Sequence, residues 1–589
     1  MRAAVLVALA TAALALLLLL PGLGATPFDD PGEGQHAEIA REAWRSGDWL
    51  TLHLNGVRYF DKPPLLYALQ ALAFTAGGVS EGTARLAPLA GAVMAAAGTA
   101  LLGARLLGPG PGLLAGAALL SCALFAAFAR YVRPETLFLA TIQWGFTGLL
   151  LGWRESRRAW SLLGCVALGL AALAKDPVGL VGPLLAVAGA AALAGRFRPI
   201  AAWLPPLGLA LMAVVGGAWY ALAAARNPGF LWYVVVDNHA RNAVLMRLFP
   251  DEDVPISVLE FVATTGLGAF PWVVPAILAV VTLLRRRAWR HPVEAPWVAL
   301  ALWAAGSVTL FTLLPFRLPH HGLPAYPAIA LLAARWWAER LPRGVRAAGW
   351  LHAGLFALLT LGCALGAASD GRLFTAEVLG VSDVTTRKAT TAAAGASLAG
   401  LWPQFSGLLA RGAIVFALGV VVLVTALALA RRRPGGWPVG ERLVAPAVAL
   451  SMLAMVPLVG AGLAVLSTSR AVPRLAAEVA ARARPGDLLV HEGPIEVSGA
   501  LELYSGHRPV LLDGMRSVLA FGATYPDARD TFWTRERFQR EWLSDRPVYL
   551  VTPRAPAASA IAAMPPDRRR LLLEDNGRRL YVNAPQPSR

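Results

Sequence analysis

The sequence predicts an all-α polytopic membrane protein with about thirteen transmembrane helices and a small C-terminal α/β domain. Hydrophobic residues make up 57% of the 589 residues, and charged residues make up only 15%, against about 25% in soluble domains. Apolar runs long enough to cross a bilayer recur within residues 1–468, whereas residues 469–589 are soluble in character. This composition excludes disordered, collagenous and disulfide-rich proteins.

The apolar runs define the candidate transmembrane helices, because about 20 apolar residues are needed to cross the hydrocarbon core. They cover approximately residues 3–25, 83–106, 110–129, 135–153, 159–174, 178–195, 200–224, 257–284, 295–315, 322–339, 347–368, 408–430 and 443–468. The short pair around 159–195 could instead form a single re-entrant element, which would change the count.

The distribution of arginine predicts the orientation of these helices. With the N-terminus and Arg2 inside, every loop expected on the inner side is basic, as the positive-inside rule requires. The residues concerned are Arg105, Arg154, Arg157, Arg158, Arg196, Arg198, Arg285, Arg286, Arg287, Arg290, Arg340, Arg343, Arg346, Arg431, Arg432, Arg433 and Arg442. The net charge of +17 is therefore mostly topological and does not require a nucleic-acid partner.

The first apolar run fits either a cleaved signal peptide or a retained anchor. Its length of about 18–20 residues exceeds the 7–15 typical of a signal peptide, so we expect an anchor. The outside segments are then residues 26–82, about 225–256, about 369–407 and everything after 469. We expect a multi-pass protein of the cell inner membrane whose C-terminal domain is extracytoplasmic.

Residues 469–589 predict a soluble α/β domain. Leu488–Val490 and Val548–Val551 have the character of short buried strands, and turn signals flank both. Residues 470–483 and 531–544 have the pattern of amphipathic helices. We therefore divide the chain into a transmembrane domain at 1–468 and a C-terminal domain at 469–589.

Residues able to carry chemistry gather in the first outside loop, residues 26–82. Acidic residues stand beside glycine and proline at 28–38, a short amphipathic helix is expected at 37–45, and Lys62 precedes Pro63-Pro64. Carboxylates there could act as a general base or hold a metal, and Arg58 and Lys62 could neutralise a lipid-borne phosphate. The alternative is a solvated acidic loop whose basic side chains reach the lipid headgroups.

Lysine is rare in this chain, which has 53 lysine and arginine residues together. Only Lys62, Lys175 and Lys388 are lysines, which suggests that a compact ammonium group is needed there, although chance retention is the alternative. Cys122, Cys165 and Cys363 lie within apolar runs and predict neither a disulfide framework nor a metal site.

Residues 29–67 resemble the first periplasmic loop of the polyprenyl-phosphate-sugar-dependent GT-C glycosyltransferases, in DDPGEGQHAEIAREAWRSGDWL and then LNGVRYFDKPPLLY. Within that family they are most similar to the aminoarabinose transferase and protein O-mannosyltransferase group. Further resemblances follow in order over about residues 1–340. They are ARYVRPE at 129–135, LAKDPVG at 173–179, RNPGF at 226–230, NH at 238–239, FPW at 270–272, LPH at 318–320 and PAYP at 324–327.

The resemblance implies a reaction. A sugar linked to undecaprenyl phosphate, or to dolichyl phosphate in related enzymes, would be the donor. An acidic side chain would orient or deprotonate an acceptor on the periplasmic face, which attacks the anomeric carbon with inversion. The acceptor would be a hydroxyl or phosphate of lipid A or another glycolipid, or a protein hydroxyl. Basic residues would stabilise the departing lipid phosphate, where negative charge develops.

The resemblance also implies candidate residues. The family usually carries an Asp-Glu pair where this chain has Gly32-Glu33, so the catalytic acid would be Glu33 or the nearby Asp30, with Glu135 as the second acid. Asp61 stands where the aminoarabinose transferases commonly have Glu, and Asp176 replaces a Gly. The donor phosphate would be bound by Arg58, Tyr59, Lys62, Lys175 and His239.

No cofactor is firmly indicated. His36, His239, His320 and His321 all fall on the expected outside face, where histidine and carboxylate side chains could bind a divalent metal ion. Their spacing does not form a tight ligand set and favours ordinary interfacial histidines. Glycine-rich nucleotide-binding loops are also missing from the sequence, which argues against a nucleotide-sugar donor.

Two other classes of function remain open at this point. A transporter or lipid flippase of cell-envelope biogenesis would carry repeated broken helices with ionisable residues near the bilayer midplane. Here such residues lie at the outside ends of the predicted spans, and no inverted repeat is visible. A structural scaffold would bind partners through its outside loops, without chemistry. The pairing of acidic and basic residues in the first loop argues against a scaffold.

Overall fold

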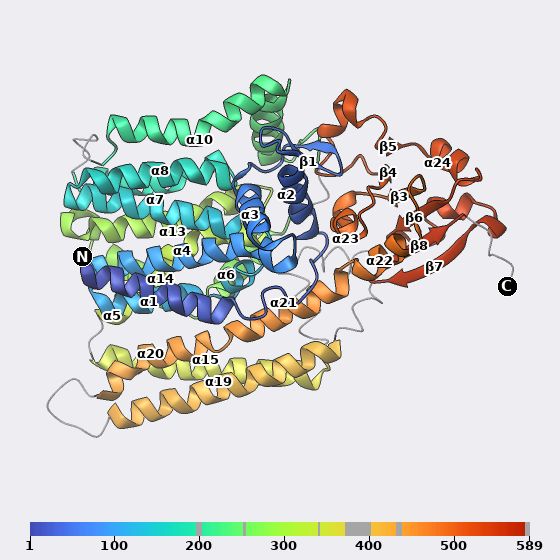
Figure 1. Ribbon diagram of the computed structural model, residues 1–589. Helices are drawn as coiled ribbons and strands as arrows, with labels where there is room; N and C mark the ends of the chain where they lie inside the picture. The colour runs from blue at the N-terminus through green and yellow to red at the C-terminus, as the bar shows by residue number, and fades with distance from the viewer. Residues whose placement is uncertain (196–202, 251–254, 340–341, 372–401, 431–438, 584–589) are drawn as a thin grey trace.

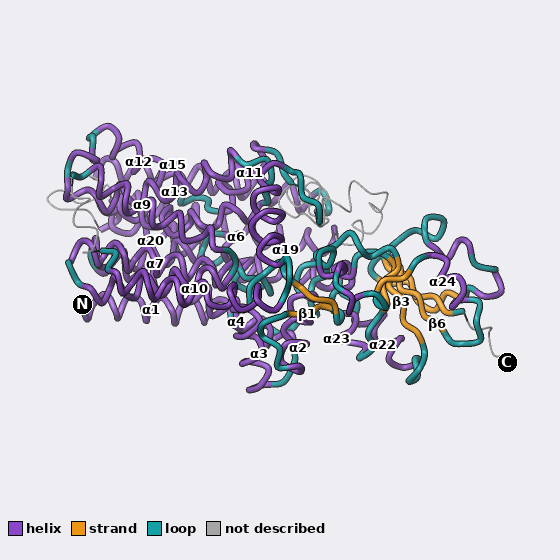
Figure 2. The backbone as a smooth tube through the Cα atoms, turned by 90° about the horizontal axis from the view of Figure 1, so that it is seen from above, coloured by secondary structure: helices purple, strands orange, loops and turns teal. Residues whose placement is uncertain are grey.

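The computed structural model describes residues 1–589 except 196–202, 251–254, 340–341, 372–401, 431–438 and 584–589. A bundle of long helices forms one part of the molecule, and a sheet formed late in the chain lies at one end of it (Figure 1). Seen from above, the sheet lies at that end, a short hairpin labelled β1 lies between it and the bundle, and the N-terminus lies at the opposite end (Figure 2). The predicted fold class is confirmed.

Eight helical segments within the described residues are long and apolar enough to cross a membrane. An additional bent pair, α11 (Val258–Gly268) and α12 (Val273–Arg285), turns by 102°. The eight are α1 (Arg2–Leu19), α4 (Glu81–Leu107), α7 (Glu135–Glu155), α10 (Pro206–Arg226), η6 with α13 (Pro292–Leu313), Gly344–Ala368 of α15 (Pro342–Ala368), Pro403–Leu429 of α19 (Trp402–Ala430), and Leu443–Arg482, which covers most of α20 (Val439–Leu453), α21 (Val456–Arg470) and α22 (Pro473–Arg482).

The difference from thirteen predicted spans arises where apolar runs form short or broken helices. The run at 110–129 divides into α5 (Pro109–Leu120) and α6 (Ala123–Phe128), and the run at 322–339 becomes η7 (Pro319–Ala325) followed by α14 (Tyr326–Ala338). The pair at 159–195 becomes α8 (Arg158–Ala174), η1 (Pro177–Leu180) and α9 (Val181–Leu193). A helix of 12 residues spans only about 18 Å, so these shorter segments are not among the eight that are long enough to cross alone.

Small residues allow the helices to pack closely. A Cβ atom added to Gly148 of α7 would lie 2.5 Å from the Cα of Gly164 of α8, so the two backbones meet where neither residue has a side chain. Such contacts between small residues are typical of helices that associate within a membrane. Because the two helices are antiparallel, the start of α7 lies beside the end of α8. Glu135, the first residue of α7, therefore lies near Lys175, which follows α8.

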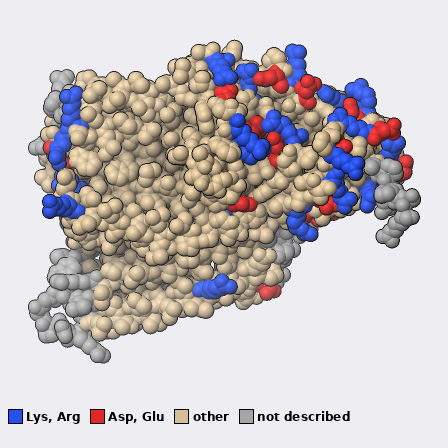
Figure 3. Space-filling model, in the orientation of Figure 1, with Lys and Arg blue, Asp and Glu red and all other residues tan. Residues whose placement is uncertain are grey.

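Charged side chains are distributed as the predicted orientation requires. Lysine and arginine gather at the end of the bundle opposite the sheet and again over the sheet, and few charges lie on the bundle between them (Figure 3). At the far end, Arg105 in the last turn of α4 pairs with Glu155 in the last turn of α7. The protein is a membrane protein; the side of the membrane that each end faces stays a prediction.

The first loop folds into a helix packed on a β-hairpin, followed by a second helix. The helix predicted at 37–45 is confirmed as α2 (Gly34–Ser46), and it packs on a hairpin of β1 (Leu52–Leu54) and β2 (Val57–Tyr59). The hairpin turn is Asn55-Gly56, with φ values of 54° and 72°. Asn-Gly is the preferred pair for a turn with two positive φ angles, so the sequence held a signal for this hairpin. Helix α3 (Leu65–Gly77) follows.

The C-terminal residues form a six-stranded sheet in the order β5-β4-β3-β6-β8-β7. Strands β3, β4, β5 and β6 are parallel, and β8 and β7 complete the sheet antiparallel. The predicted strands are confirmed within β3 and β6, and the predicted helices correspond to α22 and α24 (Arg535–Trp542). The remaining elements are β3 (Leu488–Glu492), α23 (Leu501–Ser505), β4 (Val510–Leu512), β5 (Phe532–Trp533), β6 (Val548–Thr552), β7 (Arg570–Asp575) and β8 (Arg578–Val582).

Candidate active site

A large cavity of about 1920 Å³ lies where the helical bundle, the first loop and the sheet region meet. Its apolar part is lined by side chains of the bundle, among them Leu185 of α9, Leu310 of α13 and Leu463 of α21. Its polar part is lined by the first loop, by the segment before α7 and by residues of the sheet region, including Arg578. One continuous space therefore offers an apolar surface and a set of ionisable groups.

Glu135 lies at the centre of the polar part. It is the first residue of α7, and its side chain is 3% exposed. Its Oε1 lies 3.3 Å from Nζ of Lys175 and 3.4 Å from Nε2 of His320, while its buried Oε2 has no hydrogen-bond partner among the described residues. Burial, followed by the charge of Lys175, lowers the pKa of His320 well below its usual value, so this imidazole is neutral. Glu135 thus offers one unsatisfied oxygen beside a lysine.

Asp61 and Lys62 form an ion pair on the same cavity wall. Asn238 also donates a hydrogen bond of 3.3 Å to Oδ1 of Asp61. Burial opposes ionisation of Asp61, but the charges of Lys62 and Arg247 outweigh it and lower the pKa of Asp61 to about 2. Burial also disfavours the charged form of Lys62, and Asp61 more than compensates and raises the pKa of that lysine. Both groups are therefore charged.

Lys175 is the second lysine of the site. It follows the last residue of α8 and lines the cavity beside Glu135. Burial lowers the pKa of Lys175, and the neighbouring Lys62 and Arg133 act in the same direction, whereas Glu135 opposes them. The local excess of positive charge would be relieved by an anionic ligand.

Arg133 belongs to this cluster, although the sequence analysis did not single it out. It lines the cavity two residues before Glu135, and its charge acts on Lys62, Lys175 and Glu135. The available signal was its position in the segment ARYVRPE, where a basic residue directly precedes Pro134-Glu135. Lys62, Arg133 and Lys175 thus form a cluster of three cations on the cavity wall, from the first loop, the segment before α7 and the end of α8.

Tyr59 lies on the cavity wall as a buried residue within a chain of hydroxyl contacts. Its hydroxyl accepts a 3.4 Å hydrogen bond from Tyr67, whose oxygen lies 2.9 Å from Nδ1 of His36. Burial, and then the charges of Arg133 and Lys62, lower the pKa of His36 to about 3, so this ring is neutral. Within the part of the chain that the structure describes, Nε2 of His36 has no hydrogen-bond partner. Tyr59 is thus within the same cavity as the lysines.

His239 also lines the cavity, within η3 (Trp232–Arg241). Its Nε2 lies 2.8 Å from Oδ2 of Asp176, and this hydrogen bond raises the pKa of His239. The side chain of Asp176 is therefore directed to His239, and the carboxylate that contacts Lys175 is Glu135. The two adjacent residues Lys175 and Asp176 serve different partners.

Glu33 lies apart from the cavity walls, contrary to its expected position. It is fully buried, and Arg85 holds it through two hydrogen bonds, of 2.9 Å from Nε and 2.6 Å from Nη2. The backbone N–H groups of Asp29 and Val132 donate two more. These four hydrogen bonds occupy both carboxylate oxygens, so Glu33 connects Arg85 to the backbone of the first loop and of the segment before α7.

Asp30 does line the cavity, and its Oδ1 accepts a hydrogen bond of 3.3 Å from the backbone N–H of Ala500. Burial raises the pKa of Asp30 well above the usual value, although Arg578 opposes this effect. Asp30 is therefore a neutral acid that joins the first loop to the sheet region.

Arg58 is directed away from the cavity as well. Its Nε donates a 2.8 Å hydrogen bond to Asp527, and its Nη1 donates one of 2.9 Å to Asn227. Its guanidinium also stacks 4.4 Å from the ring centroid of Tyr525. Arg58 therefore connects the hairpin to the sheet region, and we do not retain it among the residues that contact a ligand in the cavity.

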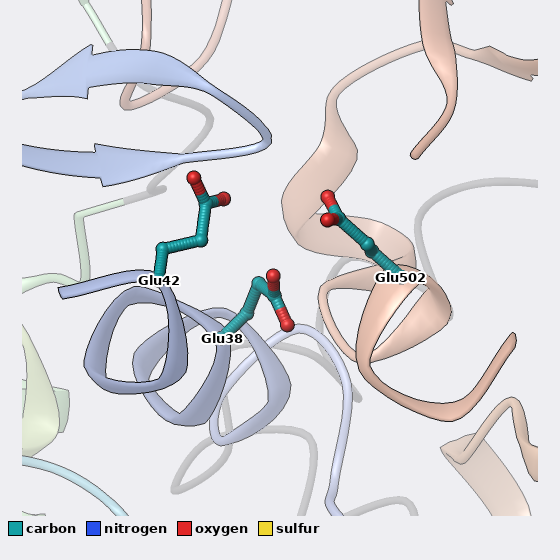
Figure 4. A group of neighbouring side chains, drawn as sticks. All are labelled: Glu38, Glu42 and Glu502. Carbon is teal, nitrogen blue, oxygen red and sulfur yellow. The ribbon is translucent and has the colours of Figure 1, made fainter. Parts of the chain in front are cut away.

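Three carboxylates outside the cavity lie close enough together to be considered as metal ligands. Within the described residues, ligand atoms of three such side chains come within 4.8 Å of one another only in Glu38, Glu42 and Glu502 (Figure 4). Arg41 donates 2.8 Å and 3.1 Å hydrogen bonds to Glu38 and Glu502, and Arg508 lies 3.1 Å from Glu42. The arginines neutralise these carboxylates, so the cluster joins α2 to α23. A divalent ion elsewhere stays a prediction.

Comparisons with known proteins agree with this geometry. The family model described as dolichyl-phosphate-mannose-protein mannosyltransferase matches residues 61–220. An undecaprenyl phosphate-alpha-4-amino-4-deoxy-L-arabinose arabinosyl transferase of Sodalis glossinidius is 26% identical over 559 residues, 90% of each chain. One from Pseudomonas aeruginosa (strain LESB58) is 28% identical over 353 residues, 56% of this chain and 60% of that protein.

A solved structure shows the same fold. The crystal structure of ArnT from Cupriavidus metallidurans bound to undecaprenyl phosphate aligns over 98% of both chains with a TM-score of 0.79 and 20% identity. This chain is therefore similar in sequence to the aminoarabinose transferases, and it shares the fold of the GT-C enzyme ArnT. The matched range 61–220 contains Asp61, Lys62, Arg133, Glu135 and Lys175, which all line the polar part of the cavity.

Proposed function

We propose that this glycosyltransferase moves a sugar from a polyprenyl-phosphate-linked donor to an acceptor at the periplasmic face of the inner membrane, with inversion at the anomeric carbon. The observation that carries the proposal is the cavity that joins an apolar helical surface to a cluster of three cations. Such a space suits a ligand with a long hydrocarbon tail and an anionic head. A flippase would need no carboxylate with an unsatisfied oxygen at this point.

The donor phosphate is placed at Lys62, Lys175 and Arg133. The phosphate gains negative charge as its bond to the sugar breaks, so cations already in position stabilise the transition state more than the ground state. The depressed pKa of Lys175 supports this placement, because an added anion would relieve the local repulsion. The polyprenyl chain follows the apolar wall formed by α9, α13 and α21.

Glu135 orients the sugar and the lysine. Its Oε1 holds Lys175, and its buried Oε2, which has no hydrogen-bond partner among the described residues, is the oxygen that would accept a hydrogen bond from a sugar hydroxyl. Tyr59 and His239 close the polar part of the cavity around the leaving phosphate. Inversion requires the acceptor oxygen to approach from the side opposite the phosphate, which leaves the wall formed by residues 29–32 for the acceptor.

The division of the chain follows from the same proposal. Residues 1–468 form the transmembrane catalytic domain with its first periplasmic loop at 26–82, and residues 469–589 form a periplasmic domain. Glu496 and Arg578 of the C-terminal region line the cavity, which supports a role for that domain as its roof. The acceptor would enter between this roof and the membrane.

The relatives suggest the donor and acceptor to be tried first. The two named above transfer 4-amino-4-deoxy-L-arabinose from undecaprenyl phosphate, according to their names. We therefore propose undecaprenyl phosphate aminoarabinose as the first donor, lipid A as the first acceptor, and polyprenyl phosphate mannose with a serine-containing peptide as the second pair.

The test uses purified full-length protein in lipid nanodiscs. Transfer of radiolabelled sugar from either donor is measured for the wild type, for Lys175→Ala and for Arg58→Gln, whose side chain lies outside the cavity. We expect Lys175→Ala to lower kcat/KM by about 100-fold, as expected for a group that stabilises transition-state charge, and Arg58→Gln to change it little. Transport of the labelled lipid without sugar transfer by the wild type would refute the proposal and favour a flippase.

A further inference from the structure

Asp29 and Tyr131 form a polar pair on the cavity wall that no sequence pattern had indicated as catalytic. The hydroxyl of Tyr131 donates a 2.7 Å hydrogen bond to Oδ2 of Asp29, and Nη1 of Arg470 lies 3.4 Å from the same oxygen. All three residues line the cavity, and the side chain of Asp29 is 4% exposed. The pair joins the first loop, the segment before α7 and the end of α21.

The absence of a side chain at Gly32 allows the Tyr131 hydroxyl to lie directly against the backbone of the first loop. A Cβ atom added to Gly32 would lie 1.7 Å from the hydroxyl oxygen of Tyr131 and 2.6 Å from its Cζ. No side chain at position 32 is therefore compatible with the present position of Tyr131. The phenol hydroxyl fills the space beside the backbone of residue 32. There it forms its hydrogen bond with Asp29.

The other carboxylates of the first loop are engaged elsewhere. Glu33 is saturated by Arg85 and lies outside the cavity walls, and Glu38 is bound by Arg41. Asp30 faces the cavity, but burial raises its pKa, so it lacks the negative charge of a base. Arg470 and the Tyr131 hydroxyl both stabilise the carboxylate form of Asp29. Asp61, an ionised carboxylate of the first loop that also lines the cavity, is paired with Lys62. Asp29 is thus the carboxylate that residues 28–38 present to the cavity through Tyr131.

Tyr131 is also close to the cations. Arg133, two residues along the chain, is near enough for its charge to act on the Tyr131 phenol as well as on Lys62 and Lys175. The ring of Phe128 lies 6.1 Å from that of Tyr131 and 5.5 Å from that of His320, the neighbour of Glu135. The Asp29–Tyr131 pair and the cation cluster therefore border the same reaction space.

We propose that Asp29 is the general base of the transfer and that Tyr131 relays the proton to it; this inference rests on the proposed function. The acceptor oxygen bonds to the anomeric carbon while the bond from that carbon to the phosphate oxygen breaks, and its electron pair remains on the phosphate. The acceptor proton, from a hydroxyl or a hydrogen phosphate, passes to the Tyr131 oxygen as the phenol proton moves to Oδ2 of Asp29. Asp29 later returns the proton to water.

The experiment compares Asp29→Asn and Tyr131→Phe with matched controls outside the cavity. Asp527→Asn alters another aspartate paired with an arginine, and Tyr525→Phe removes another hydroxyl that forms one hydrogen bond. Transfer from undecaprenyl phosphate aminoarabinose to lipid A in nanodiscs gives kcat and KM. Binding of undecaprenyl phosphate to each variant shows whether its donor site is still folded. If the wild type transfers sugar only from polyprenyl phosphate mannose to the serine-containing peptide, the variants are compared with that pair of substrates.

We expect Asp29→Asn to lower kcat by at least about 100-fold and Tyr131→Phe by about 10- to 100-fold, since general base catalysis contributes factors of this size. Donor KM and undecaprenyl phosphate binding should change by less than about threefold, because the cations remain in place. The wild-type rate should also fall at acid pH as the base takes up a proton, and the residual rate of Asp29→Asn should lack this fall.

Each other result has a definite meaning. Wild-type kcat in Tyr131→Phe would overturn the relay and with it the proposal, even if Asp29→Asn failed to fold, because the phenylalanine variant keeps the Asp29–Arg470 contact. Loss of transfer in Asp30→Asn with full transfer in Asp29→Asn would also overturn it. A wild type that transfers no sugar at all, with either substrate pair, would refute the proposed function itself.

Discussion

The buried pair of Glu33 and Arg85 allows a sharp test of whether Glu33 is structural or catalytic. The side chain of Glu33 is 1% exposed and that of Arg85 is 4% exposed. Besides Glu33, Arg85 donates hydrogen bonds to the backbone carbonyls of Leu23, Thr26 and Pro27 at 2.8–3.0 Å. One ion pair thus holds both the entry to the first loop and the backbone before α7. The perturbation is Glu33→Gln, which keeps the shape and removes the charge.

The magnitude follows from the burial of the pair. Removing one partner of a buried ion pair costs about 3–5 kcal/mol, since the remaining charge is left without compensation in a medium of low polarity. The new NH2 group would also face donors in either orientation. It would meet Arg85 and the Val132 N–H in place of Oε1, or Arg85 and the Asp29 N–H in place of Oε2. A partly exposed pair provides the matched control. Arg105 and Glu155 have side chains 17% and 20% exposed, and Glu155→Gln should cost about 1 kcal/mol or less.

The assay is unfolding in mixed detergent micelles with increasing dodecyl sulfate, followed by tryptophan fluorescence, alongside sugar transfer. We expect Glu33→Gln to lose several times more unfolding free energy than Glu155→Gln, and its remaining folded fraction to transfer sugar. A Glu33→Gln variant with wild-type stability and no transfer would refute the structural reading and restore Glu33 as the base.

Three further predictions concern the cavity and its walls. Lys175→Ala should weaken binding of undecaprenyl phosphate by about 10- to 100-fold in equilibrium binding, whereas Arg58→Gln should not, and equal effects would contradict the assignment. Asp30→Asn should raise the unfolding midpoint at pH 8 and leave it nearly unchanged below about pH 4. The folded pKa of Asp30 lies above its unfolded value, so its stabilising contribution, complete at low pH, is lost as pH rises. A difference independent of pH would argue against this. Gly32→Ala should destabilise the protein by about 1–3 kcal/mol, and the same change in a Tyr131→Ala background should cost much less, as thermal unfolding of the four variants would show. Additive costs would contradict the clash.

Much of the architecture could be predicted because it depends on local patterns. The apolar runs and the basic loops indicate a helical membrane protein, and the strands in β3 and β6 follow from short apolar segments between turn residues. Lys62 and Lys175 stood out because lysine is rare in this chain, and the structure places both in one cavity. The number of spans was less predictable, because hydropathy does not show where an apolar run such as 110–129 breaks.

Amino-acid sequence by itself determined the fold class, the order of the helices and which loop carries charged residues, because hydrophobic burial acts on the composition of contiguous segments. Only the tertiary structure decided which carboxylate is saturated and which faces the cavity. Glu33 and Asp29 are four residues apart, yet Arg85 binds the first and Arg470 and Tyr131 contact the second. Hydrogen bonds and charges act over a few ångströms in space, so their partners depend on how distant segments pack.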